Sequence, residues 1–112
     1  MSWNNELIKS AEQGNLEKVK ECLANGVSAN VGNGWALRNA SQNGYFEIVK
    51  YLVENGANVK NSSALRGASE YGHLEIVKYL VENGADVNVN DDGKTAIELA
   101  ENDKIGIFLE KN

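Results

Sequence analysis

The sequence predicts an all-α fold in which helix-turn-helix units stack into a solenoid, and an internal duplication is the main reason. Residues 46–59 read FEIVKYLVENGANV, and residues 74–87 read LEIVKYLVENGADV. Glycines 12 residues apart mark three copies of this segment: Gly14 with Gly26, Gly44 with Gly56, and Gly72 with Gly84. A single short unit of this kind cannot bury its own apolar face, so the units must stack on one another to form a continuous core.

The segments between the paired glycines predict the second helix of each unit. Their apolar residues recur at helical spacing and form one face. These residues are Leu16, Val19, Cys22 and Leu23 in the first unit, Phe46, Ile48, Val49, Leu52 and Val53 in the second, and Leu74, Ile76, Val77, Leu80 and Val81 in the third. The glycine after each segment ends the helix, because glycine readily adopts the left-handed conformation. The single cysteine, Cys22, is therefore expected in the core.

Shorter helical patterns before Gly14, Gly44 and Gly72 predict the first helix of each unit. The leucines that anchor these helices, and the small residues that let neighbouring helices approach closely, are Leu7, Leu37 and Leu65, and Ala40, Ser41, Ala68 and Ser69. A fourth pattern starts at Thr95, but its turn glycine is replaced near Lys104, so its second helix can be aligned in two ways. The last unit is therefore expected to be a shortened C-terminal cap.

Length and composition fit one soluble domain. The 112 residues are 42% hydrophobic and 24% charged, which is ordinary for a globular protein. We expect three full helix pairs and one cap, with units at about residues 1–32, 33–60, 61–91 and 92–112. No apolar run is long enough to span a bilayer and no export signal is recognisable, so we expect a soluble, intracellular and cytoplasmic protein.

The repeated motif resembles that of a known family. GHLEIVKYLVENGADVN, residues 72–88, is similar to the second helix and following turn of an ankyrin repeat, and TAIELAEN from Thr95 is similar to the first helix of another. The resemblance covers essentially the whole chain. The family's Thr-Pro-Leu-His opening of the first helix is absent, since the corresponding positions read Trp-Ala-Leu-Arg from Trp35, Ser-Ala-Leu-Arg from Ser63 and Thr-Ala-Ile-Glu from Thr95.

The connections between units are shorter than the family pattern. From the glycine that ends one second helix to the Leu or Ile of the next first helix, the spacing is 11 residues (26 to 37), then 9 (56 to 65), then 13 (84 to 97). We expect abbreviated β-hairpin fingers, reduced to a tight turn between the second and third units and best preserved before the last. Abbreviated units of this kind resemble the ankyrin arrays of giant DNA viruses of amoebae, a likeness that concerns source and not partner.

The resemblance implies a non-catalytic protein-protein interaction module, an adaptor or competitor, that binds through the concave face of its first helices. In the family, variable positions just before the turn glycine commonly touch ligands, and aromatic residues and arginine dominate binding hot spots. The expected partner-binding residues are Trp35, Arg38, Asn39, Gln42, Asn43, Tyr45, Arg66, Glu70, Tyr71 and His73. The alternative is a structural spacer, or a module that self-associates through its second helices. For single residues, Trp35 can instead cover the edge between two units, and Arg66 with Glu70 can be only an intrahelical ion pair.

Net charge and residue types narrow the partner and argue against most chemistry. A formal charge of -5 and a pI of about 4.8 argue against a nucleic-acid surface and favour a neutral or basic protein partner. We expect a monomer without membrane association and without a cofactor. With one histidine, His73, and a cysteine distant from it in sequence, we expect no metal cluster. A nucleophile supported by histidine could be assembled only through His73, so we expect no enzymatic activity.

Residues 88–99 imitate a calcium-binding loop. Four residues match positions 1, 3, 5 and 6 of such a loop: Asn88, Asn90, Asp92 and Gly93. Position 12, which should be a bidentate glutamate, is Leu99. A finger tip whose Asp-Asp-Gly makes a turn explains the segment without calcium. A calcium-controlled binder is the third functional hypothesis.

Overall fold

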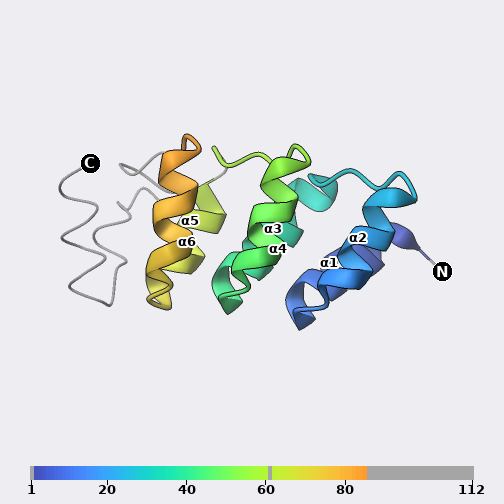
Figure 1. The fold of residues 1–112 in the computed structure, drawn as a ribbon, viewed down its shortest axis with the longest axis horizontal. Coiled ribbons are helices and arrows are strands. Elements are labelled where there is room, and N and C mark those ends of the chain that lie inside the picture. The colour runs from blue at the N-terminus through green and yellow to red at the C-terminus, as the bar shows by residue number, and fades with distance from the viewer. Residues whose placement is uncertain (1, 61, 86–112) are drawn as a thin grey trace.

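The computed structural model describes residues 2–60 and 62–85, which form six helices and no strand. The helices follow one another as three pairs: α1 (Trp3–Gln13) with α2 (Leu16–Ala24), α3 (Val31–Asn43) with α4 (Phe46–Glu54), and α5 (Ser62–Glu70) with α6 (Leu74–Glu82). The pairs stand side by side, with α1, α3 and α5 in one layer and α2, α4 and α6 in the other (Figure 1). This confirms the predicted all-α helical solenoid. The predicted cap at residues 92–112 lies outside the described residues.

Apolar side chains between the two layers form a continuous core. The largest fully buried ones are Leu7, Leu37, Leu52, Leu65, Ile76, Leu80, Val19, Val49, Val77 and Cys22. All of them occupy positions that the spacing predicted as apolar anchors or faces. A fully buried Leu or Ile contributes about 1.5–3 kcal/mol by leaving water. Leu74 and Val81, predicted on the same face, are only partly buried and line the edge of the core.

The first helices pack on one another more extensively than the second helices do. Small side chains make this possible, and Ser41 and Ser69 are fully buried, as their position predicts. Gly67 of α5 belongs to the same contact, because a Cβ atom there would lie 3.1 Å from the Cβ atom of Gln42 on α3. The two serines serve by size, since neither hydroxyl has a hydrogen-bond partner among the described residues. The stack is therefore tightest in the layer of α1, α3 and α5.

Two turn glycines are covered by a side chain of the following unit. Gly14 and Gly44 end α1 and α3 in the left-handed conformation, with φ of 78° and 81°. The ring of Tyr45 lies over Gly14 and the ring of His73 over Gly44, so that added Cβ atoms would come within 2.8 Å and 2.7 Å of ring atoms. Glycine is thus required both for its backbone conformation and for its missing side chain.

Two hydrogen bonds between units also end close to Gly14 and Gly44. Nδ2 of Asn43 donates to the carbonyl oxygen of Glu12 at 3.1 Å, and Nε2 of His73 lies 2.9 Å from the carbonyl oxygen of Gln42. Both carbonyls lie two residues before a turn glycine, in the last helical turn, where carbonyls lack an intrahelical partner. Each unit therefore supplies a hydrogen-bond donor to the end of the first helix before it.

The two described fingers are turns without any strand, at residues 25–30 and 55–60. Ser28 Oγ accepts from the N–H of Asn30 at 3.1 Å, and Asn58 Oδ1 accepts from the N–H of Lys60 at 3.0 Å. Such side-chain acceptors stabilise tight turns in place of a hairpin. The tight turn predicted between the second and third units is confirmed, and the finger before the last unit lies outside the described residues.

The first connection also contains a left-handed turn that spacing alone did not predict. Gly32, Asn33 and Gly34 have φ values of 63°, 60° and 82°, and the regular part of α3 follows them. Glycine and, at some cost, asparagine are the residues that occupy this region. This connection spans 11 residues against 9 for the next one, so the left-handed run takes up the extra length.

Two glycine-to-alanine changes separate backbone strain from steric overlap. Gly44→Ala places a Cβ atom against the His73 ring, whereas Gly56→Ala, at φ of 97°, has no atom within 4 Å of its new Cβ. Gly56→Ala is expected to lose about 1–2 kcal/mol of unfolding free energy from the left-handed backbone alone. Gly44→Ala is expected to lose about 1–3 kcal/mol more, because the ring must shift. Urea unfolding followed by circular dichroism measures both, and equal losses would contradict the covering role of His73.

Candidate functional site

The predicted partner-binding residues all belong to the second and third units. Those on α3 are Trp35, Arg38, Asn39, Gln42 and Asn43. Those on or directly after α5 are Arg66, Glu70 and Tyr71, and those that precede α4 and α6 are Tyr45 and His73. Eight of the ten therefore lie on, or directly after, a first helix.

Trp35 and Tyr71 are the exposed large apolar side chains of the described residues, with 45% and 57% of their surface accessible. The Trp35 ring lies beside the left-handed turn, 3.2 Å from the place of a Cβ atom on Gly32. Trp35 therefore covers the edge between the first and second units only in part, and much of its ring faces water. Rigid aromatic side chains in such positions are frequent anchors for protein partners.

Arg38 and Arg66 occupy equivalent positions, six residues before a turn glycine, but have different surroundings. The guanidinium of Arg38 stacks on Trp35, with Cζ 4.4 Å from the ring centroid. Arg66 pairs with Glu70 on the next helical turn, at 3.3 Å between Nε and Oε1. Such a surface stack contributes about 0.5–1 kcal/mol and such an ion pair about 0.3–0.5 kcal/mol. Stability alone therefore depends little on either pair.

Four of the predicted residues already contact the neighbouring unit. Asn43 and His73 make the hydrogen bonds between units, and Tyr45 and His73 cover the turn glycines. Gln42 is half-buried and lies against Gly67. Substituting any of these residues would alter the stacking together with the surface. Among the described residues, no such interunit contact is seen for Trp35, Arg38, Asn39, Glu70 and Tyr71.

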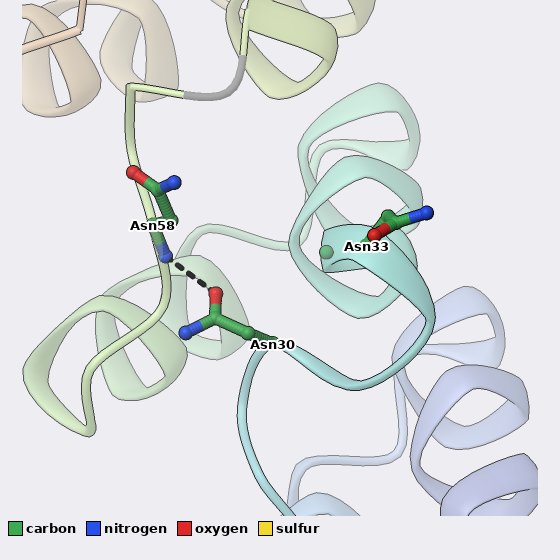
Figure 2. Close-up of a pocket in the computed structure, with 4 residues that line it drawn as sticks. Asn30, Asn33 and Asn58 are labelled. Atoms are coloured by element: carbon green, nitrogen blue, oxygen red, sulfur yellow. Dashed lines mark hydrogen bonds between the residues drawn. The ribbon is translucent and has the colours of Figure 1, made fainter.

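A pocket of about 410 Å³ lies between the two described connections, at residues that were not predicted as a site. Its lining is Asn30, Asn33, Gly34 and Asn58 (Figure 2). Oδ1 of Asn30 accepts from the N–H of Asn58 at 2.7 Å, and Nδ2 of Asn30 donates to the carbonyl oxygen of Gly56 at 2.8 Å. An amide side chain is suited to this because it both donates and accepts. The sequence signal for this contact was an asparagine in a turn. The residues that Asn30 bonds lie 26 to 28 positions later, so the pattern around Asn30 could not indicate them.

The second-helix layer has its own aromatic contacts. The Tyr79 ring meets the Phe46 ring edge-on, at 5.6 Å between centroids. Burial raises the pKa of the Tyr79 hydroxyl, and the Glu54 carboxylate raises it further. Nζ of Lys20 lies over the Tyr51 ring at 5.7 Å. Both tyrosines are thus engaged in contacts between neighbouring units.

Three observations on the described residues concern metal ligands, the single thiol and membrane spans. Within residues 2–60 and 62–85, no three His, Cys, Asp or Glu side chains gather closely enough for a metal ion. Burial raises the pKa of the Cys22 thiol, and the Glu6 carboxylate adds to this, so the reactive thiolate is disfavoured. None of the described helices has the length and apolar character needed to cross a bilayer. The calcium-like loop at residues 88–99 lies outside the described part of the chain.

Comparison with protein families gives two matches. Residues 4–63 match a family model described as ankyrin repeats (3 copies), and residues 63–100 match one described as ankyrin repeats (many copies). A comparison with curated proteins found no significant match.

Replacing Asn30 tests the bridge between the fingers. Asn30→Ala removes two hydrogen bonds between units and is expected to lower the unfolding free energy by about 1–2 kcal/mol. Lys60, at the equivalent position four residues after its glycine, makes no side-chain hydrogen bond or ion pair with the described residues. Lys60→Ala is therefore the matched control, with an expected change within about 0.5 kcal/mol. Similar losses from both variants in chemical denaturation would contradict the bridge.

The buried thiol offers a second test. Cys22 is fully buried with a raised pKa, so Ellman's reagent should label the native protein on the order of a hundredfold more slowly than the urea-unfolded protein. Native and unfolded rates within about threefold of each other would mean that Cys22 is accessible and not part of the core.

Proposed function

The chain belongs to the ankyrin repeat family, and on this premise we propose that it binds another protein through a concave face formed by its first helices. Ankyrin repeats are generally protein-protein interaction modules and are typically not catalytic. The observation that carries the proposal is the exposure of Trp35 and Tyr71 at the first helices of adjacent units. An adaptor or a competitor would both use such a face.

Differences between the second and third units support this face. Residues 46–56 and 74–84, which contain the second helices, differ at one of eleven positions. Residues 35–44 and 63–72, which contain the first helices, differ at four of ten. The differing pairs are Trp35 and Ser63, Asn39 and Gly67, Gln42 and Glu70, and Asn43 and Tyr71. The two units therefore share a scaffold and vary along the surface proposed to bind.

Packing supports a preformed surface. The first helices contact one another more extensively than the second helices, so we expect the stack to curve toward the first-helix layer. Hydrogen bonds from Asn30, Asn43 and His73 fix neighbouring units relative to one another. A preformed surface loses little conformational freedom on binding, and its specificity resides in the exposed side chains.

The proposed contact residues are Trp35, Arg38, Asn39, Gln42, Arg66, Glu70 and Tyr71. Asn43, Tyr45 and His73 support them, because these three side chains contact the preceding unit. The net charge of -5 favours a partner that is neutral or basic overall. We also propose a monomer that acts inside a cell. The reduced fingers support a source among giant DNA viruses, a proposal without consequence for the partner.

A peptide selection tests the proposed face. Random 12-residue peptides displayed on phage are selected on the immobilised full chain, and the Kd of the best binders is measured in solution. Trp35→Ala combined with Tyr71→Ala is expected to weaken binding at least about tenfold, because aromatic hot spots dominate binding energy. Glu54→Ala combined with Glu82→Ala, two exposed positions of the second helices, is the control and should leave the Kd unchanged.

Both double variants are first checked for native circular dichroism and melting temperature. Peptides that bind the first-helix variant as tightly as the unaltered chain, or a selection that yields no binder sensitive to it, would contradict the proposed face. Binders lost only by the control variant would move the function to the second helices.

A further inference from the structure

We propose that Trp35 and Arg38 form a receptor for one carboxylate, from an Asp or Glu side chain of the partner protein. This proposal rests on the proposed function, because it names what one part of the first-helix face recognises. It comes from the contrast between the two arginines at equivalent positions, of which one is neutralised within its own helix and the other is not.

The neutralised arginine belongs to the third unit. Arg66 has the Glu70 carboxylate 3.3 Å away, and both side chains are about one-third exposed, at 35% and 34%. The residue equivalent to Glu70 in the second unit is Gln42, whose side chain carries no charge. The residue one helical turn after the arginine is therefore a carboxylate in the third unit and an uncharged amide in the second.

Arg38 keeps its positive charge and its donors. Among the described residues, no carboxylate oxygen lies within 4.0 Å of its guanidinium, and no hydrogen bond joins the guanidinium to them. Its guanidinium lies over the Trp35 ring, with Cζ 4.4 Å from the ring centroid. An arginine that lies with its guanidinium face on an aromatic ring keeps its N–H groups, which point outward in the guanidinium plane, for hydrogen bonding.

The stack also prepares the arginine for a ligand. Trp35 is held beside the left-handed turn at Gly32, so it limits the rotamers of Arg38 before any partner arrives. A planar fork of donors whose orientation is fixed in advance matches the two oxygens of a carboxylate. The exposed remainder of the Trp35 ring would meet an apolar group next to that carboxylate.

The net charge favours a carboxylate over a phosphate. A phosphate presents the same kind of acceptor but carries about -1.5 to -2 charges, against one for a carboxylate. A chain with a net charge of -5 repels the more highly charged group more strongly at long range. We therefore expect a single acidic residue within a partner segment that is otherwise neutral or basic.

The test uses the peptides whose binding depends on Trp35 and Tyr71. They should share an Asp or Glu at one position, and replacing it with Asn or Gln should weaken binding to the unaltered chain at least about tenfold. With Arg38→Gln the same replacement should have less than about a twofold effect, whereas with Arg66→Gln the tenfold effect should remain. Gln at position 38 keeps the helix propensity, so the fold is retained.

Nuclear magnetic resonance signals of the two tryptophan side chains show where the acidic peptide binds. Lys18 Nζ lies over Trp3 at 5.4 Å but is already paired with Glu21 at 3.5 Å, so Trp3 provides an internal reference. The acidic peptide should shift the indole N–H signal of Trp35 and leave that of Trp3 in place.

The outcomes separate this inference from the proposed function. Peptides that depend on Trp35 and Tyr71 but contain no shared acidic residue, or whose acidic residue contributes equally with Arg38→Gln, would overturn the receptor and leave the binding face intact. Tighter binding when phosphoserine replaces the acidic residue would assign the pair to phosphate and also overturn the proposal. Absence of any peptide that depends on Trp35 and Tyr71 would remove the binding face, and the receptor with it.

Discussion

The stack depends on the contact between a turn glycine and the ring that the next unit places over it. Tyr45 over Gly14 and His73 over Gly44 set how closely successive units approach. Any side chain at either glycine would overlap the ring and strain a left-handed backbone. The same contact brings His73 within hydrogen-bonding distance of the Gln42 carbonyl, so apolar packing and backbone satisfaction are achieved together. These contacts between ring and glycine therefore help to set the distance between neighbouring first helices.

The hydrogen bonds between successive connections are less regular than the contacts at the turn glycines. Asn30 bonds in two directions to the next connection, to the Gly56 carbonyl and the Asn58 N–H. The equivalent residue one unit later is Lys60, whose ammonium donates but cannot accept, so it cannot repeat the two-way bond. Asn30 therefore joins the first two connections, whereas Lys60 makes no side-chain hydrogen bond with the described residues. A solenoid with few units depends strongly on each such interface.

Sequence reasoning found the features that depend on local periodicity. Paired glycines and apolar spacing placed the second helices, the leucine anchors and Cys22 in the core, because these follow from the geometry of one helix. The left-handed run from Gly32 to Gly34 was missed, since spacing gives the length of a connection and not its backbone conformation. Tyr45 and His73 were predicted to contact a partner, and their contact with the preceding unit was missed, because it depends on a glycine about 30 residues earlier. Which residues meet a partner stays a prediction.

The repeat explains how one surface can vary while its scaffold does not. Second helices contribute Val19, Cys22, Ile48, Val49, Leu52, Ile76, Val77 and Leu80 to the core, so a substitution on their buried face disturbs the packing. Side chains on the first helices can change without moving the backbone, provided that the small buried residues are kept. Two differences show the consequence: Trp35 in place of Ser63 gives Arg38 a ring to lie over, and Glu70 in place of Gln42 gives Arg66 a carboxylate partner. The function is therefore to be sought where the units differ, and duplication supplies the rigid frame that gives each difference a fixed position.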